Sequence, residues 1–140
     1  MDNILRDLEK FNFDKQLLKI KRKCQNKKVV IYGVGKVYQI IKTNYDLEGI
    51  NIIGASDKKF ENQEDIVFSE ELNLNTVSPL KINKLKPDLV LLTMQTDYFA
   101  EKYFHEVLFK SIKPFKYMPI FNLPVSEKIR REWAETFGNQ

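Results

Sequence analysis

The chain of 140 residues is long enough for one domain with a buried core, and its hydrophobic fraction of 43% and charged fraction of 30% are ordinary for a soluble globular protein. No apolar run approaches the roughly 18–20 residues that span a bilayer, the N-terminus has no apolar signal region, and the one cysteine cannot form an internal disulfide. We therefore expect a cytoplasmic protein without a membrane span, whose net charge of +4 permits anionic partners without requiring them.

The first 24 residues are predicted to be helical in two pieces, with the break at residues 11–14 and Asp14 as the N-cap of the second piece. The end of this segment is basic, with Lys19, Lys21, Arg22, Lys23, Lys27 and Lys28. We interpret these cations as a solvated helix end that suits the negative end of the helix dipole. No aromatic residues interleave the lysines, as they do in proteins that stack single-stranded bases, so nucleic acid is not an expected partner.

The central motif of the chain is a buried strand at residues 28–32 that leads into a glycine-rich turn and a helix beginning near Lys36. The run Val-Val-Ile-Tyr is typical of a parallel strand buried on both faces. Gly33 permits a tight bend, and Gly35 lets backbone N–H groups approach a phosphate closely. Since a helix N-terminus favours anions, we predict an anion site at residues 33–37, formed by Gly33, Val34, Gly35, Lys36 and Val37.

This Gly-x-Gly motif departs from the full dinucleotide-binding fingerprint at its third glycine position, where the chain has Tyr38. A tyrosine there is expected to push the helix away from the strand or to turn its ring over the ligand site.

A second buried strand at residues 50–55 is followed by Asp57. A carboxylate at this place suits hydrogen bonds from ribose hydroxyls. Asp57 can also be read as an ordinary turn residue in an exposed loop, and the two interpretations are compatible with each other. Lys58 and Lys59 favour a phosphate on the ribose or a sugar nucleotide.

The second half of the chain is predicted to hold short strands at 67–68 and 76–77, a helix start at Ser78-Pro79, and a strong buried strand at 88–94. The end of that strand should lie beside the end of the first one, which makes Thr93 and Gln95 candidate ligand contacts. A helix at 97–110, an edge strand at 115–121 and a helix at 126–138 follow. One face of the helix at 97–110 is expected in the core, with Phe99, Tyr103, Phe104, Val107 and Leu108. The apolar stripe of this last helix, with Trp133, is expected to pack on the domain, although a homodimer stays open.

These elements predict one α/β domain over residues 1–140, with an N-terminal helical segment (1–24), a βαβ core (28–121) and a C-terminal helix (126–138). The expected fold is a small doubly wound Rossmann-like parallel sheet of about five strands ordered 3-2-1-4-5, with helices on both faces. The expected cofactor is NAD or another nucleotide, and the residues predicted to bind it are Gly33, Val34, Gly35, Lys36, Val37, Asp57, Lys58, Thr93 and Gln95.

No catalytic residues can be assigned. His105 falls off the apolar stripe of its helix and has no evident orienting partner. The sequence also shows no catalytic triad, no metal-ligand spacing and no Walker-type motif.

The segments 29–35, 51–57 and 86–92 together resemble the small Rossmann-like domains of bacterial surface-polysaccharide pathways. Such domains occur at the N-terminus of capsular-type nucleoside-diphosphate-sugar epimerase/dehydratases, in sugar acetyltransferases, and at the C-terminus of deoxysugar C-methyltransferases. The resemblance covers roughly residues 15–121. It implies NAD, a nucleotide sugar or coenzyme A as ligand at Gly33, Gly35 and Asp57, while the catalytic domain that accompanies these modules is absent from this sequence.

The leading functional hypothesis is a nucleotide-binding module, non-catalytic alone, that serves sugar-nucleotide or cell-surface glycan metabolism and works with a separate catalytic protein. One alternative is a compact oxidoreductase or sugar-nucleotide-modifying enzyme with its site where the strand order reverses. Another is an interaction protein whose nucleotide site is degenerate.

Overall fold

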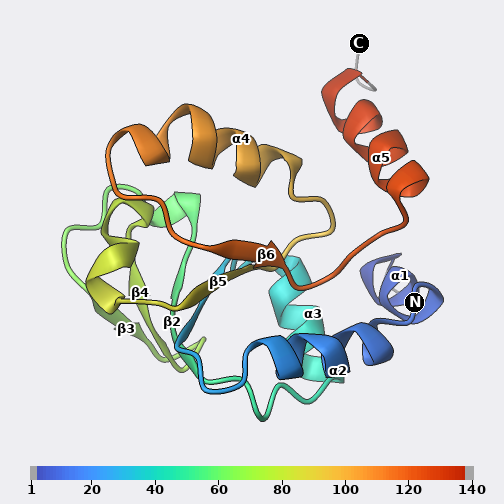
Figure 1. Ribbon diagram of the computed structural model, residues 1–140, viewed down its shortest axis with the longest axis horizontal. Coiled ribbons are helices and arrows are strands. Elements are labelled where there is room, and N and C mark those ends of the chain that lie inside the picture. The colour runs from blue at the N-terminus through green and yellow to red at the C-terminus, as the bar shows by residue number, and fades with distance from the viewer. Residues whose placement is uncertain (1–2, 138–140) are drawn as a thin grey trace.

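The structure, a computed structural model, describes residues 3–137 as a mixed α/β fold (Figure 1). Its helices are α1 (Asn3–Lys10), α2 (Phe13–Lys23), α3 (Lys36–Asn44), α4 (Tyr98–Glu106) and α5 (Val125–Phe137). Its strands are β1 (Val29–Tyr32), β2 (Ile52–Ser56), β3 (Val67–Ser69), β4 (Leu74–Val77), β5 (Leu89–Leu92) and β6 (Tyr117–Pro119). Short 3-10 turns occupy Lys58–Phe60 (η1), Pro79–Leu85 (η2) and Leu108–Lys110 (η3).

The strands form one sheet in the order β3-β4-β2-β1-β5-β6. All neighbours are parallel except β3, which pairs antiparallel with β4 at the edge. The predicted five strands ordered 3-2-1-4-5 are therefore wrong in strand count and in order. The difference arises because the two short strands expected near residues 67 and 76 pair with each other as a hairpin.

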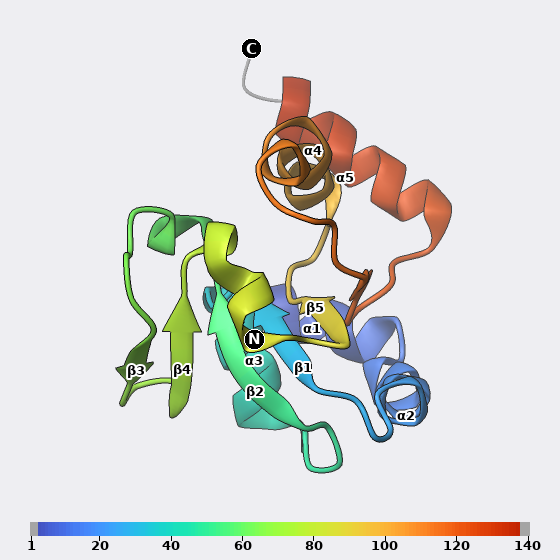
Figure 2. The ribbon, with the colours of Figure 1, turned by 60° about the vertical axis from the view of Figure 1, so that its left-hand side comes forward.

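The core lies on both faces of this sheet, as alternation along a parallel strand requires. Val29 and Ile31 of β1 pack with α1, α2 and α3 on one face. Val30 and Tyr32 pack with α4, η2 and η3 on the other. In Figure 2, α4 lies above the strands, and α3 lies behind β2 and β1. The expectation of helices on both faces is confirmed.

The N-terminal helical segment is broken in two as predicted, but the break is made by a different residue. Asn12 adopts a left-handed conformation with φ 58° and precedes α2, so Asp14 is not the N-cap. Asparagine tolerates this conformation better than most residues. The kink carries Phe13 into the core, where its ring meets those of Tyr45 and Phe121 edge-on at 4.8 and 5.8 Å.

α4 is shorter than the predicted helix at 97–110, and its apolar residues divide between two environments. Tyr103 and Phe104 are buried against the sheet, whereas Phe99 and Val107, expected in the core, are 52% and 53% exposed. A helix that is apolar on more than one side can pack only one of those sides against the sheet. Phe99 and Val107 lie on the other side of α4 and line a pocket.

α5 contacts the domain through its charged side. The Lys128 ammonium lies 2.5 Å from Asp97, and the Arg131 guanidinium lies 2.6 Å from Asp7 of α1. The opposite side carries large exposed apolar residues, Val125, Ile129, Trp133 and Phe137. The expectation that this stripe packs on the domain is wrong, because the two ion pairs hold the charged side of α5 against the domain and leave the apolar side exposed. Gly138, predicted to end the helix, lies outside the described residues.

Across residues 3–137, no helix combines the length and the apolar character needed to cross a membrane.

Candidate functional site

The turn between β1 and α3 contains two glycines with different structural roles. Gly33 has φ +102°, and a Cβ there would lie 3.0 Å from Met94 Cε and 3.1 Å from the Thr93 carbonyl oxygen. The fold therefore requires glycine at this position. Gly35 precedes α3 with φ −80°, and a Cβ there would meet no atom within 4 Å. The fold leaves clear space above Gly35, as a site for a bound group requires.

Asp57 fixes the geometry of this turn. One carboxylate oxygen accepts the backbone N–H of Val34 at 2.9 Å, and the other accepts that of Lys59 at 3.1 Å. Both contacts are with backbone N–H groups of turns, so they agree with the interpretation of Asp57 as a turn residue. The same contacts hold a carboxylate beside the predicted anion site, so an anion at the Val34 N–H would have to compete with it.

Thr93 and Gln95, two further predicted ligand contacts, do not come together. The Thr93 hydroxyl is buried and donates to the backbone carbonyls of Tyr32 and Gly33, which ties the end of β5 to that of β1. The Gln95 amide instead donates to Asp7 of α1 at 2.6 Å. Thr93 therefore holds the glycine turn in place through Tyr32 and Gly33. Gln95 shares Asp7 with Arg131 of α5 and so takes part in the contacts that hold α5.

The remaining residues at the start of α3 divide between the surface and the core. Lys36 is exposed at the first position of the helix, and Val37 is half-buried against the core cluster of that face. Tyr38 is 3% exposed within the same cluster, and burial raises the pKa of its phenol. The expected ring over the ligand site is not seen, because the core between α3 and the sheet accommodates the tyrosine.

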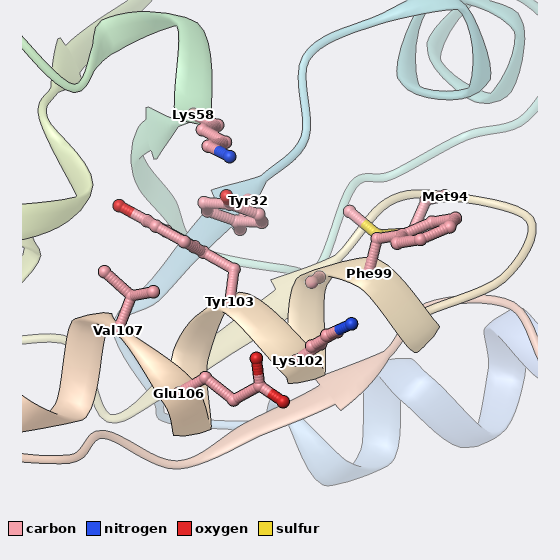
Figure 3. A pocket seen from close by; sticks show the side chains of 9 residues that line it. Tyr32, Lys58, Met94, Phe99, Lys102, Tyr103, Glu106 and Val107 are labelled. Atoms are coloured by element: carbon pink, nitrogen blue, oxygen red, sulfur yellow. The ribbon is translucent and has the colours of Figure 1, made fainter. Parts of the chain in front are cut away.

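A pocket of about 490 Å³ opens beside the turn, between the end of β1 and α4 (Figure 3). It is bounded by the end of β1, by Lys58 after β2, by the loop after β5 and by one side of α4. Its lining residues are Tyr32, Lys58, Met94, Phe99, Ala100, Lys102, Tyr103, Glu106 and Val107. Of the residues predicted from sequence, Lys58 alone lines it.

The pocket combines aromatic walls with a cation and protonated phenols. The Lys58 ammonium lies 5.2 Å from the centre of the Tyr103 ring, and the Tyr103 hydroxyl donates to Glu61 at 3.2 Å. Burial, and then the Glu61 carboxylate, raise the pKa of Tyr103 to about 12. Burial, followed by Asp57, also raises the pKa of Tyr32. Both phenols therefore stay protonated at neutral pH and can donate hydrogen bonds.

A sequence family described as "C2185-like, N-terminal" matches residues 25–104, which include β1, the glycine turn, Asp57 and most of the pocket lining. The chain belongs to this family. No curated protein matches the sequence. Among solved structures, the chain is similar to RSP, a Rex-family repressor, with 15% sequence identity and a TM-score of 0.43, over 97% of this chain and 75% of that one. A likeness at this level carries no information about function.

The pocket residues of this C2185-like domain that sequence reasoning missed are mainly Met94, Phe99 and Tyr103. The spacing of the two aromatic residues fits one apolar helix face and therefore predicts that they lie in the core. The signal that could have found them is position: α4 starts just after β5, so its first turns overhang the carboxyl ends of the strands, where ligands bind in open α/β sheets.

The histidine and the cysteine of the chain, which lie just outside the matched residues 25–104, do not line the pocket. His105 is exposed, and its Nε2 lies 2.8 Å from the Tyr117 hydroxyl. Cys24 is buried, and burial raises the pKa of its thiol, which disfavours the reactive thiolate. Among the described residues, no group of histidine, cysteine and carboxylate side chains is arranged to hold a metal ion.

Proposed function

We propose that this domain binds a nucleotide, with the base in the pocket beside α4 and the ribose and phosphates at the β1–α3 turn. The observation that carries the proposal is the position of the pocket. β1 pairs with β2 on one side and with β5 on the other. The helix that leaves β1 and the turn that leads into β5 pack on opposite faces. This is a topological switch point, where ligands of open α/β sheets bind outside the carboxyl ends of the strands.

The shape and chemistry of the pocket suit a purine or pyrimidine ring. A volume of about 490 Å³ falls in the range of small-ligand sites. Phe99, Tyr103 and Met94 offer apolar surface on which a planar base can stack. The protonated phenol of Tyr32 can donate to a ring nitrogen or a carbonyl oxygen of the base.

The ribose is expected at Asp57. The two backbone N–H bonds fix the Asp57 carboxylate at the turn, one residue before Lys58 of the pocket, and leave acceptor capacity on its oxygens. A neutral sugar hydroxyl donates to a carboxylate, whereas a phosphate is repelled by it. The phosphates are therefore expected beyond Asp57, over the open face of Gly35 and toward Lys36 or Lys58.

The finer identity of the ligand follows from the resemblance noted in the sequence: NAD, a nucleotide sugar or coenzyme A, in sugar-nucleotide or cell-surface glycan metabolism. We propose a binding module that acts with a separate catalytic protein. One acid, Asp7, and three arginines, Arg6, Arg130 and Arg131, lie around Gln95. Asp7 accepts hydrogen bonds from Gln95 and from Arg131, and these contacts hold α5. Nothing in their contacts favours the alternative of an enzyme with its site at that place.

A thermal-shift screen with NAD, NADP, coenzyme A, S-adenosylmethionine and UDP-glucose tests the proposal. A ligand present at about 100 times its Kd adds about 2.7 kcal/mol to the free energy of unfolding. Stacking of a base on an aromatic side chain contributes about 1–3 kcal/mol. Phe99→Ala should therefore weaken the binding of the ligand so found by roughly 5- to 150-fold in calorimetry.

The matched control is Phe68→Ala, since Phe68 is 55% exposed against 52% for Phe99 but lies on the edge strand β3, outside the pocket. Phe68→Ala should bind the ligand as the wild type does. The proposal fails if no nucleotide raises the melting temperature, or if Phe99→Ala and Phe68→Ala bind alike.

A further inference from the structure

The amino ends of the strands form a second groove, at the edge of the sheet opposite the pocket. Its volume is about 630 Å³, and it lies between the loop before β1, the loop before β5 and the loop before β6. Its lining residues are Asn26, Lys27, Asn83, Pro87, Asp88, Lys113, Pro114, Phe115 and Lys116. These three loops are far apart in the sequence, so their joint surface was not visible in it.

Hydrogen bonds fix the three loops to one another. The backbone N–H of Lys28 donates to the Asp88 carboxylate at 2.8 Å, and the Asp88 N–H donates to the Lys28 carbonyl at 2.8 Å. The Asn83 side chain donates to the Lys113 carbonyl at 2.8 Å. The side chains along the groove are therefore presented by a fixed scaffold.

The groove is strongly basic. Lys27, Lys113 and Lys116 line it beside one acid, Asp88. The stretches 26–28, 83–88 and 110–116 that form the groove carry four more lysines outside its lining, Lys28, Lys84, Lys86 and Lys110. All seven lysines are exposed. The one acid is Asp88, whose carboxylate already accepts the Lys28 N–H. Clustered lysines on low-dielectric walls create a positive potential that concentrates anions.

We propose that this groove binds the phosphate backbone of a double-stranded nucleic acid. Lysines supply phosphate contacts that neutralise charge without reading sequence. The one aromatic residue of the groove, Phe115, is 9% exposed and cannot stack on an unpaired base, which favours a duplex over a single strand. None of the large exposed apolar residues of the described chain lines the groove, so it offers no apolar anchor to a lipid surface.

This inference is independent of the proposed nucleotide site and revises the expectation drawn from the basic segment at residues 19–28. That expectation considered one helix end. The structure brings Lys113 and Lys116 of the loop before β6 beside Lys27 of the loop before β1, and so forms a charged groove from segments far apart in the sequence.

The experiment is fluorescence anisotropy of a labelled DNA duplex of about 25 base pairs, titrated with the full chain at several concentrations of KCl between about 50 and 200 mM. The variants are the pair Lys113→Gln/Lys116→Gln in the groove and the control pair Lys10→Gln/Lys15→Gln. The control lysines are also exposed, lie at the end of α1 and the start of α2, and do not line the groove, so both pairs change the net charge equally.

Binding should weaken linearly in a plot of log K against log salt, and the groove pair should reduce the slope by about 2, since each phosphate contact contributes roughly 0.9. The control pair should keep the wild-type slope. Circular dichroism of both pairs establishes that the variants fold.

Four outcomes overturn the proposal. One is the absence of duplex binding at about 50 mM salt. A second is equal weakening by the two lysine pairs, which would show a general effect of net charge. A third is tighter binding of the single strand than of the duplex. The fourth is retention on phosphatidylserine vesicles that depends on Lys113 and Lys116 while the duplex does not bind.

Discussion

The two glycines of the β1–α3 turn should differ in how strongly substitution by alanine lowers the stability of the fold. Gly33→Ala places a side chain at positive φ, which costs about 1–2 kcal/mol. Its Cβ would also lie 3.0–3.1 Å from Met94 Cε and from the carbonyl and hydroxyl oxygens of Thr93. Thr93 is buried and hydrogen-bonded to Tyr32 of β1, so it cannot move aside easily. Overpacking of this kind costs about 1–3 kcal/mol. The sum is about 2–5 kcal/mol of unfolding free energy, or a melting temperature lower by about 6–18 °C.

Gly35→Ala adds the same methyl group at an ordinary φ and into open space. Alanine is a poorer N-cap residue than glycine, which lowers the free energy of unfolding. It also reduces the conformational entropy of the unfolded chain, which raises the free energy of unfolding. Each effect is below about 1 kcal/mol, so they nearly cancel. Urea unfolding followed by circular dichroism measures both variants. Gly35→Val should keep the fold and abolish nucleotide binding, because its side chain fills the space assigned to the phosphates. A Gly33→Ala protein as stable as the wild type would refute the geometry of the turn, and a Gly35→Val protein that binds normally would place the ligand elsewhere.

Two further predictions concern carboxylates. Asp57→Ala removes the acceptor of the Val34 N–H, so it should lower the unfolding free energy and also weaken nucleotide binding by about 1.5–3 kcal/mol; unchanged affinity in calorimetry would remove Asp57 from the site. Hydrogen bonds from Arg130 and then Arg131 lower the pKa of Glu127 to about 2, so the favourable contribution of this carboxylate to α5 is present above the ordinary carboxyl pKa and is lost as pH falls toward 2. The NMR chemical shifts of α5 amides should change as pH falls toward 2, and Glu127→Gln should abolish this pH dependence.

The sequence carried enough information to place the buried strands, since β1 and β5 are continuous apolar runs whose burial on both faces depends on little else. It also placed the glycine turn, because Gly33 is needed by local backbone geometry. It did not predict that Asp57 would bind Val34, because that contact depends on how two loops meet after the sheet has formed.

The pocket was the least accessible to sequence reasoning. An apolar residue such as Phe99 has the same spacing whether it faces the core or a cavity, and periodicity cannot separate these outcomes. The orientation of α5 was hidden for a similar reason. Its apolar stripe predicts a buried face, but the ion pairs of Lys128 and Arg131 with distant acids turn that face outward.

This orientation of α5 has a consequence for spectroscopy. Trp133 is the one tryptophan in the chain, and it is 65% exposed on α5 with its ring 4.7 Å from that of Phe137. Its emission therefore reports on the surroundings of α5 alone, whereas circular dichroism sums the signals of all helices and of the sheet. Two unfolding curves that differ between these methods would describe the separation of α5 from the domain, and a blue shift of the emission at constant secondary structure would signal that another molecule has covered the helix.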